Sequence, residues 1–427
     1  MKINPIKLAS IKPSKFQNFS FGRVFFAQNL DCASFSNLAS FDTSLFFKRG
    51  IIKEGESLEQ FFNRISSSIF KDNEEKKEKE EFLLRLKKGE ITLSSSCYKN
   101  LSNPQSARAY ELDFDSPISK NLLLLNDAIF QGVGVGINFS KSKNPTQDIL
   151  KINDYFKYIE EKSPNKRPPA GIALLNWDNS DILNFIILKN NPNYNDWCFD
   201  LSIVLNDDFF QKLEKKDKNA IEIYEALVEN MLNSGEPAVI FSNKKDYICD
   251  SCAASELKKG ENLTLAHVNL SKFEKEGNVD WHNFKKAAKI LTLATNKIDE
   301  NHKIGLLGYQ ELLDKLKIEY SSPLALEILK KAIEEIQNAG SKVAISPTST
   351  TSRFLKTSFS IEPKKNTDYF EQIKTLSVAQ KQIDEDGGLG QISNTIILKE
   401  NATKKDVDDI IILSKKMGLK GVSVFKN

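Results

Sequence analysis

The sequence predicts an α/β protein with a buried sheet. Segments with helical periodicity alternate with short runs rich in β-branched residues along most of the chain. Many of those short runs are apolar throughout, as expected of strands that are covered on both faces. The chain has 427 residues, of which 40% are hydrophobic and 27% charged, so it can bury a sizeable core. Interleaved helices and strands of this kind are typical of α/β folds.

The N-terminal part is expected to be mainly helical. Residues 1–50 are rich in Ser, Asn and Phe without clear periodicity, which indicates irregular or weakly helical structure. Apolar residues recur at helical spacing between 57 and 70, and a charged stretch then leads into a second apolar group that ends near residue 90. The run EEKKEKEE in that stretch is typical of a solvated helix face.

Helices and strands alternate in the remainder of the chain. No Pro-rich or Ser-rich linker follows residue 95, so the sequence predicts an N-terminal segment over 1–95 and one large domain over 96–427. The predicted helices lie at 117–131, 219–233, 281–298, 323–338 and 402–415. The predicted strands lie in the runs GVGINFS, GIALLNW, DLSIVL, PAVIFS, KVAIS, TIILK and GVSVF.

Three of these helices begin with a capping signal. Asp115 or Ser116 precedes Pro117, a residue that suits the first helical position. Asp280 precedes the third predicted helix, and Thr403 is the expected cap at the beginning of the last one. We therefore expect these helices to start at these residues.

Composition and charge exclude several classes of protein. The 60 basic and 57 acidic side chains give a net charge of +3 and no electrostatic footprint for nucleic acid. No segment approaches the ~18 uninterrupted apolar residues of a membrane span. The five cysteines are too sparse for a disulfide framework, and the first residues lack the apolar core of a secretory signal. A reducing, cytoplasmic location is therefore expected.

Gly132, Gly134 and Gly136 have a spacing similar to that of a phosphate-binding loop. These glycines follow a predicted helix and lead into a predicted strand, whereas a dinucleotide fingerprint needs the reverse order. We therefore interpret them as a helix-to-strand turn that requires positive φ.

Cys249 and Cys252 form an isolated CxxC pair. A structural zinc site needs four ligands, and His267, His282 and His302 are too scattered to complete one, so no metal is expected. A thioredoxin-like pair needs a helix after it, and the following AASELKKGEN is short and polar. Two alternatives stay open: cysteines buried for structural reasons, and a redox or radical cysteine at 252.

Hydroxyl side chains are concentrated in SPTSTTS, at 346–352, directly after the predicted strand KVAI. A strand that opens into a helix or turn at this point would aim several hydroxyls and backbone N–H groups at one place, which suits a phosphate. An ordinary helix cap explains the same residues equally well.

Taken in order, several segments resemble the catalytic subunit of ribonucleotide reductase, and more so its adenosylcobalamin-dependent class II branch. The stretch from Asp115 and Ser116 to GVGVGINFS is similar to the family's DS…GxGxGxxxS. NKRPPAGIALLNW and NSDILNFIILK are similar to RRGA…HPDIxxFIxxK, and ISPTSTTSRFLKTSFSIEP resembles iaPTGTIS…GIEP. DLSIVLNDDFF, GEPAVIF, IGLLGYQELLDKLKIEYSS and the closing stretch from QISNTIILK also resemble family segments. The resemblance covers residues 90–427.

This resemblance implies a fold, a reaction and a cofactor. The family folds as a ten-stranded α/β barrel with a finger loop through its centre, the architecture shared with glycyl-radical enzymes. Its active members use a cysteine thiyl radical to take the 3′ hydrogen of a ribonucleotide, in the deoxyribonucleotide biosynthesis that supplies DNA replication. The class II branch implies adenosylcobalamin as cofactor, and the family implies deoxyribonucleotide effectors.

The family's radical motif, NxCxE, matches Asp250, Cys252 and Ala254. The resemblance makes Cys252 the expected radical carrier and Asp250 a candidate for hydrogen bonding or acid/base help. Ala254 replaces the family's general acid/base carboxylate. The catalytic site is therefore expected to be degenerate.

Two further family cysteines form a disulfide as the ribose 2′-OH leaves. One of these positions corresponds to Leu263, and the other falls near Ala109, with Cys97 close by. Because leucine cannot donate a reducing equivalent, the usual two-cysteine reduction cannot run in this chain, and an external reductant would have to replace it.

The resemblance also implies nucleotide-binding residues. The residues expected to bind substrate are Pro347, Thr348, Ser349 and Thr350, which match the family's diphosphate cradle, together with Cys97. The residues expected to bind effector are Asp115, Ser116 and Arg167.

Two hypotheses follow. The first is a divergent ribonucleotide reductase large subunit whose activity is lost or altered. The second is a non-catalytic nucleotide-binding or assembly protein that forms a heterodimer with a complete reductase. A homodimer is compatible with the first hypothesis. Ala254 and Leu263 favour the second, whereas Cys252 and the cradle favour the first.

Overall fold

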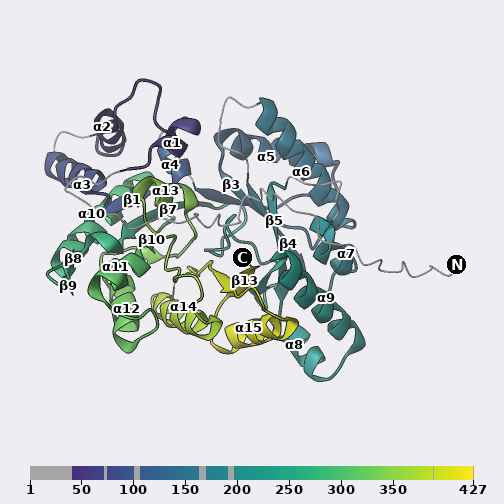
Figure 1. The fold of residues 1–427 in the computed structure, drawn as a ribbon. Coiled ribbons are helices and arrows are strands. Elements are labelled where there is room, and N and C mark those ends of the chain that lie inside the picture. The colour runs from purple at the N-terminus through teal and green to yellow at the C-terminus, as the bar shows by residue number, and fades with distance from the viewer. Residues whose placement is uncertain are drawn as a thin grey trace.

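A computed structural model describes residues 41–71, 75–100, 106–162, 170–190, 197–387 and 389–426. The expectation for residues 1–40 and the predicted effector residue Arg167 lie outside these ranges. Helices are arranged around one large sheet, and the first three helices lie together at one side of the molecule (Figure 1).

The helical prediction for the N-terminal part is confirmed between 57 and 90. Ser57 and Gln60 form a reciprocal capping box at the first turn of α2, which satisfies two backbone N–H groups. Gly89 ends α3 in the left-handed conformation. The elements of this part are α1 (Ser44–Lys48), α2 (Leu58–Ile69), α3 (Lys76–Lys88), β1 (Ile91–Leu93) and α4 (Ser95–Lys99).

The large sheet contains eleven strands among the described residues. Ten of them follow the order β11-β10-β7-β2-β3-β4-β5-β6-β13-β12, and β1 pairs separately with β7. The strands are β2 (Ala107–Tyr110), β3 (Gly134–Asn138), β4 (Gly171–Asn176), β5 (Phe199–Leu205), β6 (Ala238–Phe241), β7 (Asn262–Asn269), β10 (His302–Leu307), β11 (Lys342–Val343), β12 (Thr395–Leu398) and β13 (Gly421–Lys426). A separate hairpin pairs β8 (Glu274–Lys275) with β9 (Asn278–Val279).

The sheet consists of parallel sets that meet in antiparallel pairs. Strands β2 to β6 run parallel in chain order, β7 is parallel to β10 and β11, and β12 is parallel to β13. The sets join antiparallel where β2 meets β7 and where β13 meets β6. The ladder does not close between β11 and β12, where the described contact is one isolated bridge from Ile345 to Ile392.

The predicted helices and strands are largely confirmed. The bounds of α10 and α12 equal the predicted ones, and Asp280 and Thr403 cap their helices through side-chain hydrogen bonds. Every predicted β run contains a strand, although KVAIS forms only the short β11. The remaining helices are α5 (Ile118–Gln131), α6 (Pro145–Lys162), α7 (Ile182–Ile186), α8 (Asp207–Glu214), α9 (Lys218–Ser234), α10 (Trp281–Ile298), α11 (Tyr309–Leu316), α12 (Pro323–Asn338), α13 (Ser349–Leu355), α14 (Tyr369–Asp384) and α15 (Lys404–Lys416), with 3₁₀ turns at Leu188–Asn190 and Leu270–Lys272.

The predicted cap of α5 is wrong. Pro117 itself is the N-cap, in an extended conformation, and the helix begins at Ile118 without a side-chain cap. The Ser116 hydroxyl donates to Asp113 Oδ2 at 2.6 Å, which holds it in the preceding turn. This is consistent with the bias of the residue before a proline away from helical angles.

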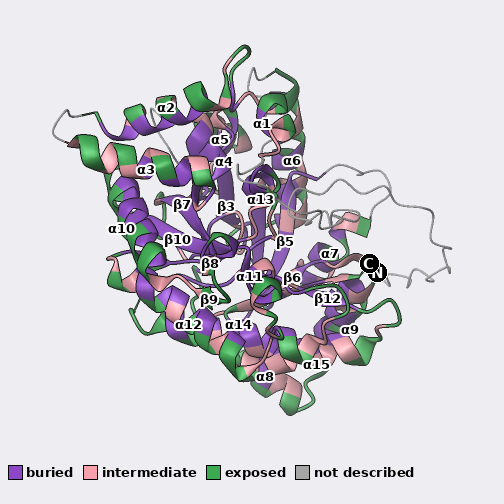
Figure 2. Ribbon diagram, turned by 60° about the vertical axis from the view of Figure 1, so that its left-hand side comes forward, coloured by how far each residue is buried: buried purple, intermediate pink, exposed green. Residues whose placement is uncertain are grey.

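Both faces of the sheet are buried, as the apolar strands predict. On β4, Ala173 and Leu175 join the main core under the helices, whereas Ile172 and Leu174 face a separate small cluster. We call the face that carries Ile172 and Leu174 the inner face. Figure 2 shows the strands buried and the helices exposed mainly on their outward sides. Within the described ranges, no helix is both long and apolar enough to cross a membrane.

Candidate active site

A loop between β6 and β7 lies against the inner face of the sheet. We call residues 247–257 the central loop. The backbone N–H of Asp250 donates to the Ser255 carbonyl at 3.0 Å, and that of Leu257 donates to the Ile248 carbonyl at 3.1 Å. These bonds fold the central loop into a narrow hairpin whose tip contains Cys252.

Two glycines of β3 make room for the central loop. A Cβ on Gly136 would collide with the carbonyl oxygen of Cys249, and one on Gly134 would collide with the Ser251 side chain. The predicted turn with positive φ is confirmed at Gly132, where φ is 67° at the end of α5. Gly134 and Gly136 have a different role, because they permit close approach of another backbone.

The central loop contacts strands from both halves of the sheet. On one side its residues pack against β4, β5 and β6, and on the other side against β2, β7 and the segment after β11. The first cluster comprises Tyr247, Cys249, Ile172, Leu174, Val204 and Ile240. The second comprises Ile248, Ala254, Leu257, Ala109, Leu263, Leu265 and Ala344. The loop therefore occupies the centre of the inner face.

Asp250 organises the tip of the central loop. Its Oδ1 accepts the backbone N–H groups of Ala254 and Ser255, both at 2.7 Å, and its Oδ2 accepts that of Cys252 at 3.0 Å. Burial raises the pKa of Asp250, and these hydrogen bonds oppose the rise. Because both oxygens bind the loop's own backbone, this carboxylate fixes the position of Cys252.

The two cysteines of the CxxC pair differ in environment. Cys249 is fully buried in the first cluster, and burial raises its pKa well above the ordinary value, which disfavours a thiolate. Cys252 at the tip is half-buried. The cysteines within the described ranges are not joined in disulfides, and no group of metal-binding side chains gathers among those residues.

Apolar side chains occupy the positions where the resemblance leads us to expect redox and acid/base groups. These side chains lie together in the structure. Ala109, Ala254 and Leu263 are each 0% exposed and belong to the second cluster. None of these side chains can exchange a proton or an electron. A hydrocarbon cluster therefore stands beside the tip where the resemblance would place two thiols and a carboxylate.

Lys303 is a buried cation next to the central loop. Its side chain is on β10, only 2% of the residue is exposed, and its Nζ donates to the Ser255 hydroxyl. Burial lowers the pKa of Lys303 to about 8, whereas the Asp250 carboxylate raises it. Lys303 thus contacts the loop through Ser255, and its positive charge lowers the pKa of the Asp250 carboxyl.

Cys97 lies in a buried hydroxyl network at the start of β2. Its Sγ is 3.3 Å from the Ser106 hydroxyl and 3.1 Å from that of Ser94. Ser106 in turn accepts the backbone N–H of Leu265 at 2.8 Å and donates its own N–H to the Leu263 carbonyl. Cys97 is therefore linked, through Ser106, to the strand that contains Leu263.

The predicted phosphate cradle lies where the chain leaves β11 and enters α13. Thr348 is the N-cap of α13 but makes no side-chain capping hydrogen bond, so the helix-cap interpretation of this hydroxyl is not supported. Pro347, Thr348 and Ser349 are half-buried, and Thr350 is buried and accepts a hydrogen bond from Arg49 Nη1.

The segment around this cradle contains several buried polar atoms that have no hydrogen-bond partner in the described part of the chain. A buried unsatisfied polar group costs about 1–3 kcal/mol, so such a concentration is typical of a ligand site. The hydroxyl groups concerned are those of Ser346, Thr348, Ser352, Thr357 and Ser360, and Oε1 of Glu362 belongs to the same segment. Burial raises the pKa of Glu362 to about 8.

His267 is a further buried polar group on β7. It is 0% exposed, neither ring nitrogen has a partner among the described residues, and burial lowers its pKa to about 3. It pairs in register with Gly305, and a Cβ there would approach the imidazole to 2.9 Å. His267 is therefore neutral, and Gly305 makes room for its ring.

Two of the predicted effector residues, Asp115 and Ser116, lie within the described ranges, in the turn before α5. Asp115 is exposed and forms an ion pair with Lys143 at 3.2 Å, and Ser116 bonds to Asp113. The residues 111–115 line a surface cavity of about 350 Å³. The neighbouring residues Leu112 and Phe114 also line a second cavity, of about 540 Å³, together with Ile248 of the central loop.

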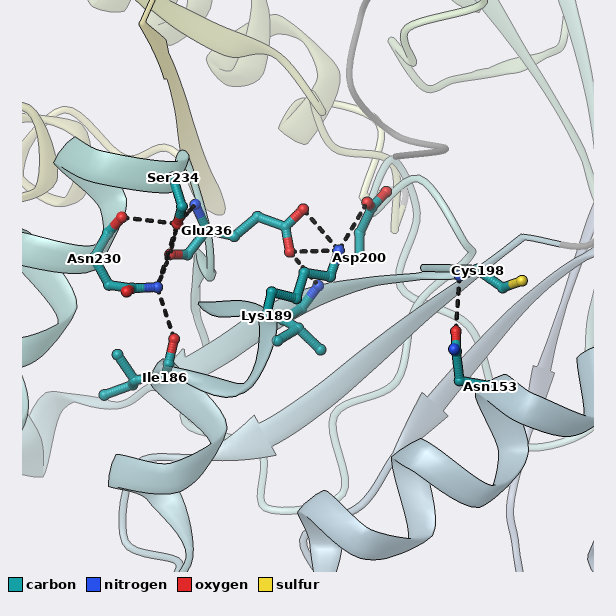
Figure 3. Close-up of polar contacts among 9 residues, drawn as sticks. Asn153, Ile186, Lys189, Cys198, Asp200, Asn230, Ser234 and Glu236 are labelled. Atoms are coloured by element: carbon teal, nitrogen blue, oxygen red, sulfur yellow. Dashed lines mark hydrogen bonds and ion pairs between the residues drawn. The ribbon is translucent and has the colours of Figure 1, made fainter. Parts of the chain in front are cut away.

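A buried ion cluster braces the wall of the sheet near the start of β5 (Figure 3). Lys189 Nζ lies 2.7 Å from Glu236 and 3.8 Å from Asp200. Glu236 also accepts the backbone N–H of Leu201. Asn230 donates to the carbonyls of Ile186 and Glu236, both at 2.7 Å, on the other side of the cluster. These contacts join the loop before β6 to β5 and to the end of α7.

Several of these residues were not predicted from the sequence. Arg49 and Lys303 belong to no recognisable motif. Glu236 and Glu362 lie in the family-like segments GEPAVIF and SIEP, but the resemblance does not single them out as site residues. For His267 the sequence suggests only a metal ligand. The one available signal was polarity inside an apolar run, as in HKIGLL for Lys303 and NLTLAHVN for His267. Such a residue is costly to bury unless it has a partner or a ligand.

Comparison with known proteins finds relatives both in sequence and in fold. The sequence is 25% identical over 283 residues to a vitamin B12-dependent ribonucleoside-diphosphate reductase of Thermoplasma acidophilum, covering 53% of this chain and 36% of the relative. It is 22% identical over 221 residues to the protein of the same name from Mycobacterium tuberculosis, covering 41% and 31%. No family model matches the sequence.

A solved structure gives the same result for the fold. The alpha subunit of the Actinobacillus ureae class Id ribonucleotide reductase matches with a TM-score of 0.72 and 15% identity, covering 90% of this chain and 96% of that chain. In fold and in sequence the chain is therefore similar to the large subunit of ribonucleotide reductase. Its named sequence relatives are of the vitamin B12-dependent, class II branch. The chain spans about a third of the length of these curated relatives.

Proposed function

We propose that the chain is a ribonucleotide reductase-like protein that binds nucleotide at the cradle and whose reductase activity is lost or altered. The observation that supports this proposal most directly is the apolar cluster of Ala109, Ala254 and Leu263 beside the tip of the central loop. Cys252 remains at the tip, half-buried and held by Asp250.

The chemistry of ribose reduction explains why the cluster matters. The thiyl radical of Cys252 would take the 3′ hydrogen, a proton must then reach the leaving 2′ hydroxyl, and two electrons must enter the sugar. No side chain of the cluster supplies that proton or those electrons. If the chain is active, an external dithiol must be oxidised to a disulfide as each ribonucleotide becomes a deoxyribonucleotide and water.

The barrel is part of this proposal. The parallel sets of strands, joined antiparallel at two places, suit a ten-stranded barrel with the central loop inside it, and the bridge from Ile345 to Ile392 supports closure. The division into an N-terminal segment over 1–95 and a barrel over 96–427 remains a proposal. Strand β1, which precedes that boundary, pairs with β7 of the large sheet.

Adenosylcobalamin is the proposed cofactor, because the named relatives are vitamin B12-dependent. When bound, it would supply the radical that oxidises the thiol of Cys252. The partial exposure of Cys252 at the tip fits such contact. Deoxyribonucleotide effectors are proposed at Asp115, Ser116 and Arg167, and a cytoplasmic location and homodimer formation remain predictions.

The second candidate function is a non-catalytic one. A protein that keeps the nucleotide cradle and replaces the reducing groups by packed hydrocarbon suits an assembly partner of a complete reductase. The apolar cluster favours this candidate, since its members are packed and fully buried rather than left as a cavity.

Turnover distinguishes the two candidates. Purified protein is incubated with the four ribonucleotides, adenosylcobalamin and dithiothreitol, and deoxyribonucleotide is measured. Product that disappears in Cys252→Ser would exclude the non-catalytic candidate. Absence of product together with measurable nucleotide binding would exclude the reductase.

A further inference from the structure

We infer that Arg49 supplies the positive charge of the phosphate site at the cradle, so that the N-terminal segment completes the site for a pyrophosphate group. This inference rests on the proposed function, because it concerns the ligand of the same cradle. It adds a cationic residue for which the resemblance gives no counterpart.

The segment that contains Arg49 is firmly docked on α13. The rings of Phe46 and Phe354 stack at 3.9 Å between centroids with an interplanar angle of 5°. The backbone N–H of Asp42 donates to the Phe354 carbonyl at 2.9 Å. Phe46 is 0% exposed, so this contact belongs to the core. The position of Arg49, three residues after Phe46, is therefore set relative to α13.

A second set of contacts fixes the backbone at Arg49. Lys99 Nζ donates to the carbonyls of Arg49 at 3.2 Å and of Gly50 at 3.1 Å. Gly50 has a φ of 61°, which turns the chain sharply after α1. With the backbone held on this side, the guanidinium reaches across to the hydroxyl of Thr350. Arg49 is thus a half-buried cation directed at the cradle.

The hydroxyls around Thr350 divide into two groups. Those of Thr350 and Thr351 have protein partners, which are Arg49 and the Thr348 carbonyl. Those of Ser346 and Ser352 have no partner among the described residues, although these residues are only 1% and 0% exposed. A hydroxyl donates readily to a phosphate oxygen. The partnerless hydroxyls are therefore an independent indication of an anionic ligand at this place.

Hydroxyls alone do not balance the charge of a pyrophosphate group. A guanidinium has a rigid fork of five N–H donors, so it can bond a hydroxyl and phosphate oxygens together. Its weak hydration makes it the cation best suited to a partly buried phosphate. Arg49 therefore provides charge and geometry that Thr348, Ser346 and Ser352 cannot.

Binding of pyrophosphate, ADP and adenosine to the full-length protein, measured by calorimetry, tests this inference. Hydrogen bonds to charged groups contribute about 1.5–3 kcal/mol, so Arg49→Gln is expected to weaken pyrophosphate and ADP binding roughly ten- to hundredfold. Arg49→Lys keeps the charge and is expected to weaken them less. Lys48→Gln removes the same charge one residue away, at an exposed position, and is expected to change binding less than twofold.

The outcomes separate this inference from the proposed function. Pyrophosphate and ADP binding that is as tight in Arg49→Gln as in Lys48→Gln overturns the role of Arg49. Binding of pyrophosphate that depends on Arg49, with ADP bound no tighter than pyrophosphate, supports the anion site but contradicts a nucleotide site. Failure of the unmodified protein to bind any of the three overturns both. Arg49→Lys serves as the test variant if Arg49→Gln does not fold.

Discussion

The carbonyl oxygen of Cys249 occupies the space that a side chain on Gly136 would need. This contact ties the central loop to β3 at the backbone, one residue before Asp250 and three residues before Cys252 at the tip. The position of the thiol thus depends on a residue of the sheet that has no side chain.

Gly136→Ala is expected to displace the central loop. Overpacking of this kind costs about 1–3 kcal/mol, and the contact is to backbone, which cannot rotate away. Gly277→Ala is the control: it lies in the β8–β9 turn at φ 77° with open space around it, and should cost about 1 kcal/mol. Urea unfolding gives the stabilities, and the alkylation rate of Cys252 should change only in Gly136→Ala. Unchanged alkylation would contradict this dependence.

Ala254→Glu is expected to destabilise the protein rather than restore the family's carboxylate. An unpaired charge buried in the apolar cluster costs about 3–5 kcal/mol. Ala253→Glu is the matched control, because Ala253 is the neighbouring residue and is only half-buried. Urea unfolding at pH 7 measures both variants. A stable Ala254→Glu protein with new reductase activity would show that the site still accepts the missing group.

His267 is expected to make the protein less stable in acid. Its pKa is about 3 in the folded protein and about 6.5 when unfolded, so below pH 6.5 the unfolded chain binds a proton that the folded chain does not. Stability from this group is complete above pH 6.5 and falls by about 1.4 kcal/mol per pH unit down to about pH 3.

Comparison of variants isolates this effect. His267→Gln should lack that slope, so the difference between the wild-type and variant unfolding free energies should fall by about 1.4 kcal/mol per pH unit between pH 6.5 and about pH 3. His282→Gln, which changes an exposed histidine, should leave the acid slope as it is in the wild type. Parallel acid slopes for wild type and His267→Gln would mean that His267 is protonated in the folded protein.

Loss of Glu236 is expected to be costly because Lys189 is buried. Lys189 and Glu236 side chains are 9% and 10% exposed, and removal of one partner of a buried pair costs about 3–5 kcal/mol. Asp200, 3.8 Å from Lys189 Nζ, still compensates part of the charge of the lysine. The expected loss of stability in Glu236→Gln is therefore about 3 kcal/mol, the lower end of this range. Glu229→Gln breaks the exposed pair with Lys404 and should cost less than about 1 kcal/mol. Thermal unfolding measures the stability of both variants. Equal losses of stability in Glu236→Gln and Glu229→Gln would show that the buried pair stabilises the protein no more than the exposed one.

Local patterns in the sequence predicted the elements well. The bounds of α10 and α12 follow from apolar periodicity, and the start of α10 follows also from its capping residue Asp280. The start of α15 follows from Thr403, which forms a capping box with Asp406. These signals lie within a few residues of what they determine, so a single sequence is enough to recognise them.

Relationships between distant residues were not predictable in the same way. Gly134 and Gly136 suggested a turn, because nothing nearby in the sequence indicates that the central loop passes over them. The hydroxyl of Ser116 donates to Asp113 instead of capping the first turn of α5. Both partners are close in the sequence, so residue spacing alone does not predict which hydrogen bond forms. Family motifs singled out Cys252 and residues 347–350 as candidates, but not Arg49 or Lys303, since each of these two contacts a segment that is distant along the chain.

The stacking of Phe46 on Phe354 has a consequence for the order of folding during synthesis. The nearby contact from Arg49 to Thr350 joins residues 301 positions apart. At ribosomal rates of about 5–20 residues per second, α1 emerges roughly 15–60 s before the helix on which it docks. Throughout that interval the ring of Phe46 can contact Phe61 and Tyr98 but not Phe354, so the docking of α1 on α13 is expected to be among the last contacts to form.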